Sequence, residues 1–191
     1  ILSETHHENQ EEIATILEQT EKLDFLIQSL VKLSRMESGI IAVHSEDTTI
    51  TQMLESIQQQ FNVKVREKNI TLSLCDTDLH VRCDSKWTVE ALGNIVDNAI
   101  KYTACGGNVQ IKVEQYSFFV KIDIIDDGIG IEKEEIPKIF GRFYRSLSVA
   151  DQPGVGVGLF LAREIIQAQK GYVKVKSEIG KGSTFSVFLP V

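Results

Sequence analysis

Long hydrophobic runs are absent from this sequence. Its most apolar stretch, residues 117–125, is interrupted by Lys121 and Asp123 and falls far short of the roughly 20 residues that a membrane-spanning helix needs. Residues 1–10 are polar and charged, with neither the basic start nor the apolar run of a signal peptide. They include no initiator methionine, so we expect the chain to be a piece of a longer protein.

Cysteine and basic charge are also scarce. Cys75, Cys83 and Cys105 are odd in number and show none of the paired short spacings of a zinc site, so we expect free thiols in a reducing cytoplasm. A disulfide between Cys75 and Cys83 is the alternative, because the two could flank one turn. The 27 acidic and 20 basic side chains give a net charge of −7, which argues against a broad nucleic-acid-binding surface.

The overall composition is that of an ordinary globular protein. Of the 191 residues, 42% are hydrophobic and 25% are charged, which excludes disorder as the main state. A chain of this length corresponds to one full domain and something smaller.

Residues 11–36 contain neither proline nor glycine and predict one long helix. Additional apolar side chains widen its face toward that of a bundle helix, which one helix alone cannot bury. We therefore expect partner helices from an absent segment, from a second chain, or from both; packing onto the following domain is the alternative. The seam repeats every seventh residue and consists of Ile13, Thr20, Ile27 and Ser34, interleaved with Ile16, Leu23 and Leu30.

The remaining residues predict an α+β domain in which helices are layered on one face of a sheet. Two hairpins are expected, at 108–116 with 118–125 and at 172–177 with 183–189. Shorter strands are expected at 40–43 and at 71–75, with 79–83 as the neighbour of 71–75. Helices are expected at about 48–68, 85–101, 132–139 and 158–169.

Asn94, Asn98 and Lys101 form the first candidate site. Their spacing of i, i+4 and i+7 places two amides and an ammonium on one helical face. Amide oxygens suffice for Mg²⁺ where phosphates supply the charge and water completes the octahedron. Taken alone, these residues are equally typical of a solvated helix surface.

A second motif, Asp126-Asp127-Gly128-Ile129-Gly130, directly follows an apolar strand. A carboxylate at a strand end can accept a proton from an exocyclic amine, and the glycines allow the backbone to approach a planar base. A calcium-binding loop is the alternative, but the regular oxygen spacing and terminal Glu of such loops are absent.

Two further motifs precede the last predicted helix. Residues 154–158, Gly-Val-Gly-Val-Gly, open that helix and offer free N–H groups to an anion, although they match neither a P-loop nor a dinucleotide fingerprint. Residues 139–145 combine aromatic side chains, which would anchor a mobile loop, with Arg145, which would reach a terminal phosphate.

Together with residues 180–185, Gly-Lys-Gly-Ser-Thr-Phe, these motifs resemble, in order and spacing, the catalytic ATP-binding domain of bacterial sensor histidine kinases. The resemblance covers about residues 47–191, and the helix at 5–37 resembles the second helix of the dimerisation and phosphotransfer hairpin in that family. It implies a Bergerat two-layer α/β sandwich preceded by one long bundle helix, divided into residues 1–39 and 40–191. Departures are small: Asp127 stands where Asn is frequent, and Gly141 where Glu is frequent.

The resemblance also implies a role for each motif residue. Asn98 would bind Mg²⁺ with Asn94 assisting, Asp126 would bind the adenine amino group, and Arg145 would meet the phosphates. Asn94, Lys101 and Arg145 would serve catalysis. The nucleotide contacts would comprise Asn94, Asn98, Lys101, Tyr102, Asp126, Gly128, Gly130, Ile131, Tyr144, Arg145, Gly154, Val155, Gly156, Val157, Gly158, Leu159 and Thr184.

No run resembling the family's phosphoacceptor sequence His-Glu-Leu-Arg-Thr-Pro occurs here, and His6 and His7 lie where the hairpin loop is expected. The resemblance therefore implies transfer of the γ-phosphoryl group of ATP to a His outside this chain. A response-regulator receiver domain, a homodimer formed by the helical bundle, a cytoplasmic location and membrane attachment only through other segments are implied as well.

Three alternatives remain. The first is an ATPase of the gyrase, mismatch-repair or chaperone type, but those enzymes carry Glu where Asn94 stands, because hydrolysis needs a base. The second is a nucleotide-binding regulatory module without kinase activity. The third is a serine kinase that inhibits a sigma factor, against which the long helix argues.

Overall fold

The computed structural model of the chain describes residues 43–149, 152 and 154–191, together with residues 12, 13, 16, 17, 19, 20, 23, 24, 26–28, 30, 31 and 34. It divides into two compact units, one of residues 43–148 and 156–191, the other of residues 1–42 and 149–155. Every described position between 12 and 34 is helical, in agreement with the predicted long helix. His6, His7 and most of the predicted strand at 40–43 lie outside the described residues, and the division at residues 39 and 40 stays a prediction.

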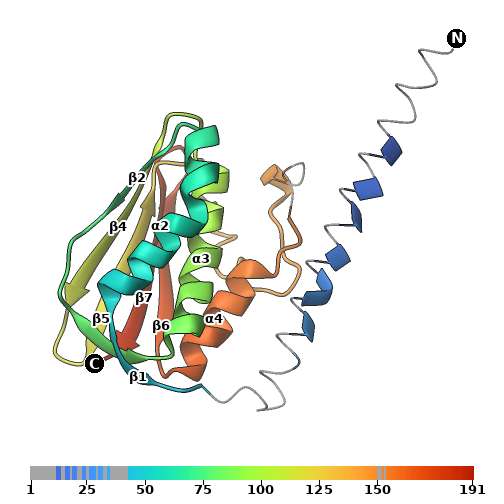
Figure 1. Ribbon diagram of the computed structural model, residues 1–191. Helices are drawn as coiled ribbons and strands as arrows, with labels where there is room; N and C mark the ends of the chain where they lie inside the picture. The colour runs from blue at the N-terminus through green and yellow to red at the C-terminus, as the bar shows by residue number, and fades with distance from the viewer. Residues whose placement is uncertain are drawn as a thin grey trace, which may run out of the picture. The chain divides into compact units, whose positions relative to one another are not determined.

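A five-stranded sheet in the order β2-β4-β5-β7-β6 forms one layer of the larger unit (Figure 1). Both predicted hairpins are confirmed, as β4 pairs antiparallel with β5 and β6 pairs antiparallel with β7. β5 and β7 are also antiparallel neighbours, whereas β2 joins β4 in parallel. The strands are β2 (Thr71–Leu74), β4 (Asn108–Gln115), β5 (Phe119–Asp126), β6 (Tyr172–Glu178) and β7 (Gly182–Pro190).

Two local predictions are wrong. The strand expected beside 71–75 is β3 (His80–Cys83), but it pairs antiparallel with β1 (Glu46–Thr49) in a separate two-stranded sheet, whereas β2 pairs with β4. Residues 133–140 form successive turns rather than a helix. Pro137 has no N–H and interrupts the helical hydrogen-bond pattern there.

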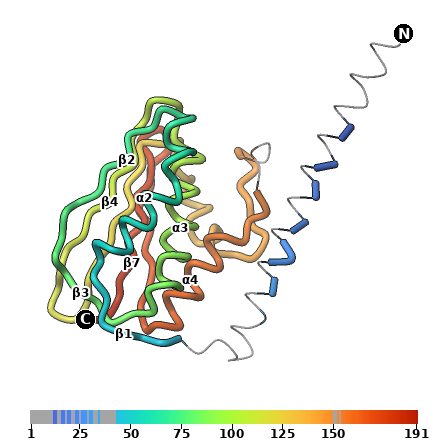
Figure 2. Tube along the Cα trace, in the orientation of Figure 1, coloured from blue at the N-terminus to red at the C-terminus, as the bar shows by residue number. Residues whose placement is uncertain are grey.

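Three helices cover one face of the five-stranded sheet, as Figure 1 and Figure 2 show. They are α2 (Ile50–Glu67), α3 (Ser85–Tyr102) and α4 (Gly158–Ala168), close to the predicted ranges. The two layers confirm the α+β sandwich. Within the described part of the chain, every helix is too short or too polar to span a bilayer. The core between the layers includes Ile57, Leu92, Ile95, Ile122, Ile124, Ile165, Val187 and Leu189.

A buried polar junction sets the relative register of α3 and α4. Gln169, which follows α4 and is 5% exposed, accepts the N–H of Asp84 through Oε1 at 2.7 Å, and its Nε2 donates to Thr88 Oγ1 at 3.2 Å. Asp84 also caps α3 by accepting the N–H of Trp87 at 3.1 Å. The end of α4 therefore lies at the start of α3, and the two helices run antiparallel.

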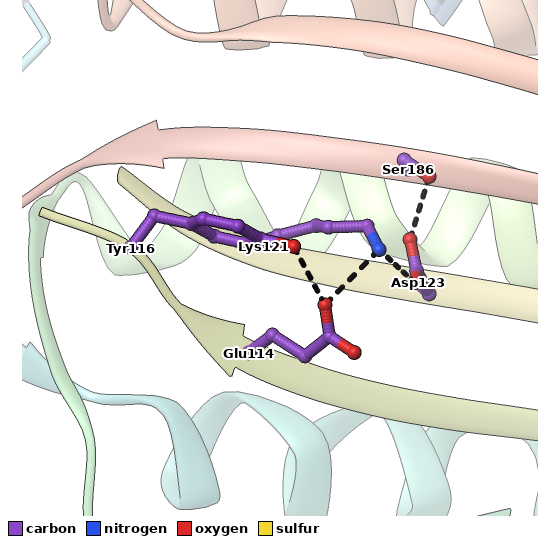
Figure 3. A network of polar contacts seen from close by, with 5 residues as sticks. All are labelled: Glu114, Tyr116, Lys121, Asp123 and Ser186. Atoms are coloured by element: carbon purple, nitrogen blue, oxygen red, sulfur yellow. Dashed lines mark hydrogen bonds and ion pairs between the residues drawn. The ribbon is translucent and has the colours of Figure 1, made fainter. Parts of the chain in front are cut away.

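The two charges that interrupt the apolar stretch of β5 lie on the sheet face opposite the helices, since side chains alternate along a strand. Lys121 Nζ contacts Asp123 Oδ2 at 2.6 Å and Glu114 Oε2 at 3.2 Å. Tyr116 donates its hydroxyl to Glu114, and Ser186 donates to Asp123, so these five side chains form one network (Figure 3). The network explains how β5 accepts charge without losing its apolar inner face.

Candidate nucleotide-binding site

Asp126 is the last residue of β5 and is 7% exposed. Its Oδ1 accepts the backbone N–H groups of Gly128 at 3.0 Å and Ser183 at 3.1 Å. Burial raises the pKa of Asp126, although these two N–H groups act in the opposite direction. Residues 43–149 and 154–191 provide no hydrogen-bond donor to its second oxygen, Oδ2, which can therefore accept a hydrogen bond from a ligand.

The loop after Asp126 packs closely against neighbouring backbone, which explains why glycine is needed at positions 128 and 130. A Cβ at Gly128 would lie 2.7 Å from the carbonyl oxygen of Tyr102 and 2.8 Å from Asp126 Oδ1. Gly130 has a φ of 74°, and a Cβ there would lie 2.1 Å from the carbonyl oxygen of Glu178. The carboxylate and the end of α3 are thus brought together by close backbone approach.

On α3, Asn94, Asn98 and Lys101 are half-buried on one face. Asn94 Nδ2 donates to the carbonyl of Glu90 at 2.9 Å. Its Oδ1 points toward the start of α4, because a Cβ at Gly158 would lie 2.9 Å from that oxygen. The antiparallel register of the helices therefore brings the predicted amide and the first residue of α4 side by side.

Positive charge gathers near the end of α3. Lys101 Nζ lies 4.9 Å from the centre of the Tyr102 ring. Burial, and then the charge of Arg145, lower the pKa of Lys101, and burial raises the pKa of Tyr102. Two like charges held close together are stabilised by an anion between them, so this end of the site suits phosphate.

The segment that carries Arg145 is fixed by a contact with glycine. Gly156 has a φ of 76°, and a Cβ there would lie 2.5 Å from the carbonyl oxygen of Tyr144 and 3.1 Å from Arg145 Cγ. The hydroxyl of Tyr144 donates to Glu135 Oε1 at 3.0 Å, so it is occupied by a protein partner. Arg142 stacks over Phe160 of α4 at 4.7 Å.

The other predicted contact residues lie in different environments. Ile131 donates its N–H to Ser177 Oγ at 2.8 Å, beside the same loop. Val157 is buried in the core and Leu159 is half-buried. Gly154 and Val155 group with the other unit, and their predicted contact with the nucleotide stays a prediction.

The strand register differs from the expectation for Thr184. Thr184 pairs with Ile125, whereas Ser183 pairs with Asp126 and donates its backbone N–H to it. Because side chains alternate across a sheet, Thr184 points to the face opposite Asp126. The residue beside the carboxylate is Ser183, which sequence reasoning missed. Phe185, Val187 and Leu189 face the core from β7. Because side chains alternate along a strand, Ser183 lies on the same face as these residues, and the sequence pattern could have identified it.

The family of histidine kinase-, DNA gyrase B-, and HSP90-like ATPases matches residues 83–191. Among curated proteins, the sensor histidine kinase WalK of Bacillus subtilis (strain 168) is 33% identical over 177 residues, which make up 90% of this chain and 29% of WalK. The chain thus spans less than a third of the length of this relative.

Solved histidine kinases share the fold. Full-length ShkA in complex with AMPPNP aligns with a TM-score of 0.80 at 21% identity, over 95% of this chain and 38% of ShkA. The catalytic domain of ThkA aligns with a TM-score of 0.67 at 26% identity, over 76% of this chain and 95% of that one. ThkA in complex with the response regulator protein TrrA aligns with a TM-score of 0.67 at 22% identity, over 87% of this chain and 49% of that one. Because the family match extends over more than half of the residues, the chain belongs to the histidine kinase-, DNA gyrase B- and HSP90-like ATPases, and its relatives there are sensor histidine kinases.

Proposed function

We propose that this chain is the ATP-binding catalytic region of a sensor histidine kinase, which transfers the γ-phosphoryl group to a His outside these residues. The observation that carries the proposal is the hydrogen bonding of the Asp126 carboxylate. Its Oδ1 is held by two backbone N–H groups while Oδ2 has no donor from residues 43–149 or 154–191. A buried carboxylate with one oxygen free is suited to accept a hydrogen bond from the amino group of adenine.

The closely packed loop completes the base pocket in this proposal. Gly128 and Gly130 leave no room for side chains, so a planar ring can approach the backbone. The phenol of Tyr102 is neutral at physiological pH and burial raises its pKa further, so its ring offers a flat, uncharged surface. Ser183, opposite Asp126, takes the supporting role that sequence reasoning gave to Thr184.

The phosphates would lie along α3 toward the start of α4. Lys101 and Arg145 supply positive charge, and Gly158 at the first turn of α4 allows close approach to that helix end. Mg²⁺ would be held by Asn98, with Asn94 assisting, only together with phosphate oxygens, because the described residues contain no group of three His, Cys, Asp or Glu side chains suited to a metal. When bound, the ion neutralises part of the phosphate charge.

Transfer is favoured over hydrolysis by Asn94. A carboxamide cannot take a proton from water, and its Nδ2 is already used on the carbonyl of Glu90. Arg145 would neutralise charge that develops on the γ-phosphoryl group, and positioning supplies most of the remaining rate enhancement. The acceptor imidazole must come from residues outside this chain.

The long helix supports the proposed assembly. Ile13, Ile16, Leu23 and Ile27 are large apolar side chains of this helix, and all are exposed. We propose that residues 1–39 belong to a phosphotransfer hairpin that forms a homodimeric bundle in the longer protein, whereas residues 40–191 form the catalytic domain. In that protein the His would pass its phosphate to the receiver domain of a response regulator, in the cytoplasm, with any membrane attachment provided by other segments.

The experiment separates transfer from hydrolysis. The chain is mixed with Mg-ATP labelled at the γ-phosphate and with a separate, intact hairpin that carries the His. We expect acid-labile label on the hairpin and none on the chain itself. Label released only as free phosphate would support the ATPase alternative, and label on His6 or His7 would refute an acceptor outside the chain.

A further inference from the structure

Lys68 makes a contact that the proposed mechanism does not use. It directly follows α2, and its ammonium donates to three backbone carbonyls near the end of α3. The distances are 2.8 Å to Ile100, 2.6 Å to Lys101 and 2.7 Å to Thr103. An ammonium has three N–H donors, so this contact employs all of them.

These carbonyls are the ones that a helix end leaves without partners inside the helix. The fourth carbonyl of this turn, that of Tyr102, accepts the N–H of Ile129 at 3.3 Å. Every carbonyl from residue 100 to 103 therefore has a donor. The ammonium also lies at the negative end of the α3 dipole, where a cation is stabilising.

Lys68 is itself held in place. Its carbonyl accepts the N–H of Gly106 at 3.1 Å, in the loop that follows α3, and its own N–H donates to the carbonyl of Lys64 at 3.1 Å. The side chain and the backbone of one residue thus attach α2 to both sides of the turn that ends α3.

The turn held in this way carries two residues of the candidate nucleotide site. Lys101 and Tyr102 project from it, and the carbonyl of Tyr102 is the surface against which Gly128 packs. We propose that Lys68 is a positioning residue for nucleotide binding: its clamp on three carbonyls fixes the turn that places Lys101, Tyr102 and the loop after Asp126. This inference rests on the proposed nucleotide-binding function.

Lys64 provides a matched control. It lies one turn earlier on α2 and also reaches α3, where its Nζ contacts Asp97 Oδ1 at 2.5 Å. That contact joins two exposed side chains and leaves the carbonyls at the helix end untouched. Lys64→Met and Lys68→Met remove the same charge and the same donor group, one from the last turn of α2 and one from the residue that follows it.

The test measures ATP affinity by calorimetry, in the presence of Mg²⁺, well below the melting temperature of each variant. We expect Lys68→Met to weaken binding about tenfold or more, because displacements near 1 Å at a site have effects of that size or larger. Lys64→Met should stay within about twofold, as exposed ion pairs contribute little. Lys68→Arg should recover affinity to within about threefold, since a guanidinium can still donate to the carbonyls.

A second readout separates positioning from general loss of stability. In the Lys68→Met variant, the amide resonances of residues 101–103 and 128–130 should shift while those of β6 and β7 stay in place. If Lys68→Met does not fold, Lys68→Gln, which keeps two donors without the charge, replaces it, and weakened binding is again expected.

Wild-type affinity in a folded Lys68→Met or Lys68→Gln variant would overturn the inference and leave the proposed function intact. Equal losses in Lys64→Met and Lys68→Met would also overturn it, because charge rather than the clamp would then be responsible. Failure of the wild-type chain itself to bind ATP would instead refute the proposed function.

Discussion

Replacing Asp126 by Asn should separate ligand recognition from folding. The amide keeps Oδ1, so the N–H groups of Gly128 and Ser183 retain their acceptor. At the second position an NH₂ group replaces the free oxygen and meets the amino group of adenine donor to donor. The loss of a charge-assisted hydrogen bond costs about 1.5–3 kcal/mol, and the mismatched donors add about 1–3 kcal/mol. A total of about 2.5–6 kcal/mol corresponds to a loss of affinity between about 70-fold and about 25,000-fold.

Asp126→Asn should weaken ATP binding without lowering the free energy of unfolding. Burial raises the pKa of Asp126, which means that the folded chain disfavours its charged form at neutral pH. A neutral amide removes that penalty, so the free energy of unfolding of Asp126→Asn should equal or exceed that of the wild type. Calorimetric titration with ATP and urea denaturation at pH 7 measure the two quantities on one preparation.

Asp127→Asn is the matched control, because it removes the same charge from the next residue. Asp127 accepts the backbone N–H and the Nδ2 of Asn108, both at 2.8 Å, and the backbone bond is the main cause of its lowered pKa. This variant should lose some stability and bind ATP as the wild type does. An Asp126→Asn variant that binds ATP normally, or a loss of binding shared equally by the two variants, would refute the reasoning.

Four further outcomes follow from contacts in the structure. ATP affinity should fall as the pH is lowered from neutrality toward the raised pKa of Asp126, because the protonated carboxyl no longer offers a free acceptor oxygen; calorimetry across that range would contradict this if affinity stayed constant. Gly128→Ala should lower both ATP affinity and the free energy of unfolding, the latter by about 1–3 kcal/mol, because its Cβ would overlap a carbonyl oxygen at the end of α3. Gly93→Ala, whose Cβ would meet only ordinary contacts from 3.5 Å, should instead be neutral or stabilise α3 by up to about 1 kcal/mol in thermal unfolding. Gln169→Leu should lower the free energy of unfolding in urea by about 2–4 kcal/mol, since it leaves the N–H of Asp84 and a buried hydroxyl without partners, and an unchanged urea midpoint would contradict it.

The sequence was sufficient to predict those site residues whose placement depends only on their own strand, loop or helix. A carboxylate at a strand end, glycines beside it and three polar residues on one helical face can each be identified from spacing alone. The structure places these motifs together, and the glycine contacts show why Gly128 and Gly130 are needed. The pairing of β1 with β3 was missed because residues 46–49 are polar and carry no alternating pattern, so their role depends on a partner strand distant in sequence.

Lys68 could not be predicted in the same way. Its partners are backbone carbonyls 32 to 35 residues further along the chain, and a carbonyl acceptor has no sequence signature. Its immediate neighbours are charged and polar, typical of a solvated helix end. Contacts from side chain to distant backbone are therefore the class of interaction that sequence reasoning misses at this site.

The two ends of the site differ in what holds them, and the difference assigns them different tasks. At the base end, Asp126 and the last turn of α3 are fixed by hydrogen bonds to backbone groups, which favours discrimination because a preorganised pocket does not adapt to a wrong base. At the proposed phosphate end, burial and then the charge of Arg145 lower the pKa of Lys101, so the two cations lie near each other. Such a cluster attracts any polyphosphate and discriminates little among them. If the proposed function is correct, selectivity for ATP over other nucleoside triphosphates should therefore arise at Asp126, and Asp126→Asn should reduce that selectivity as well as the affinity.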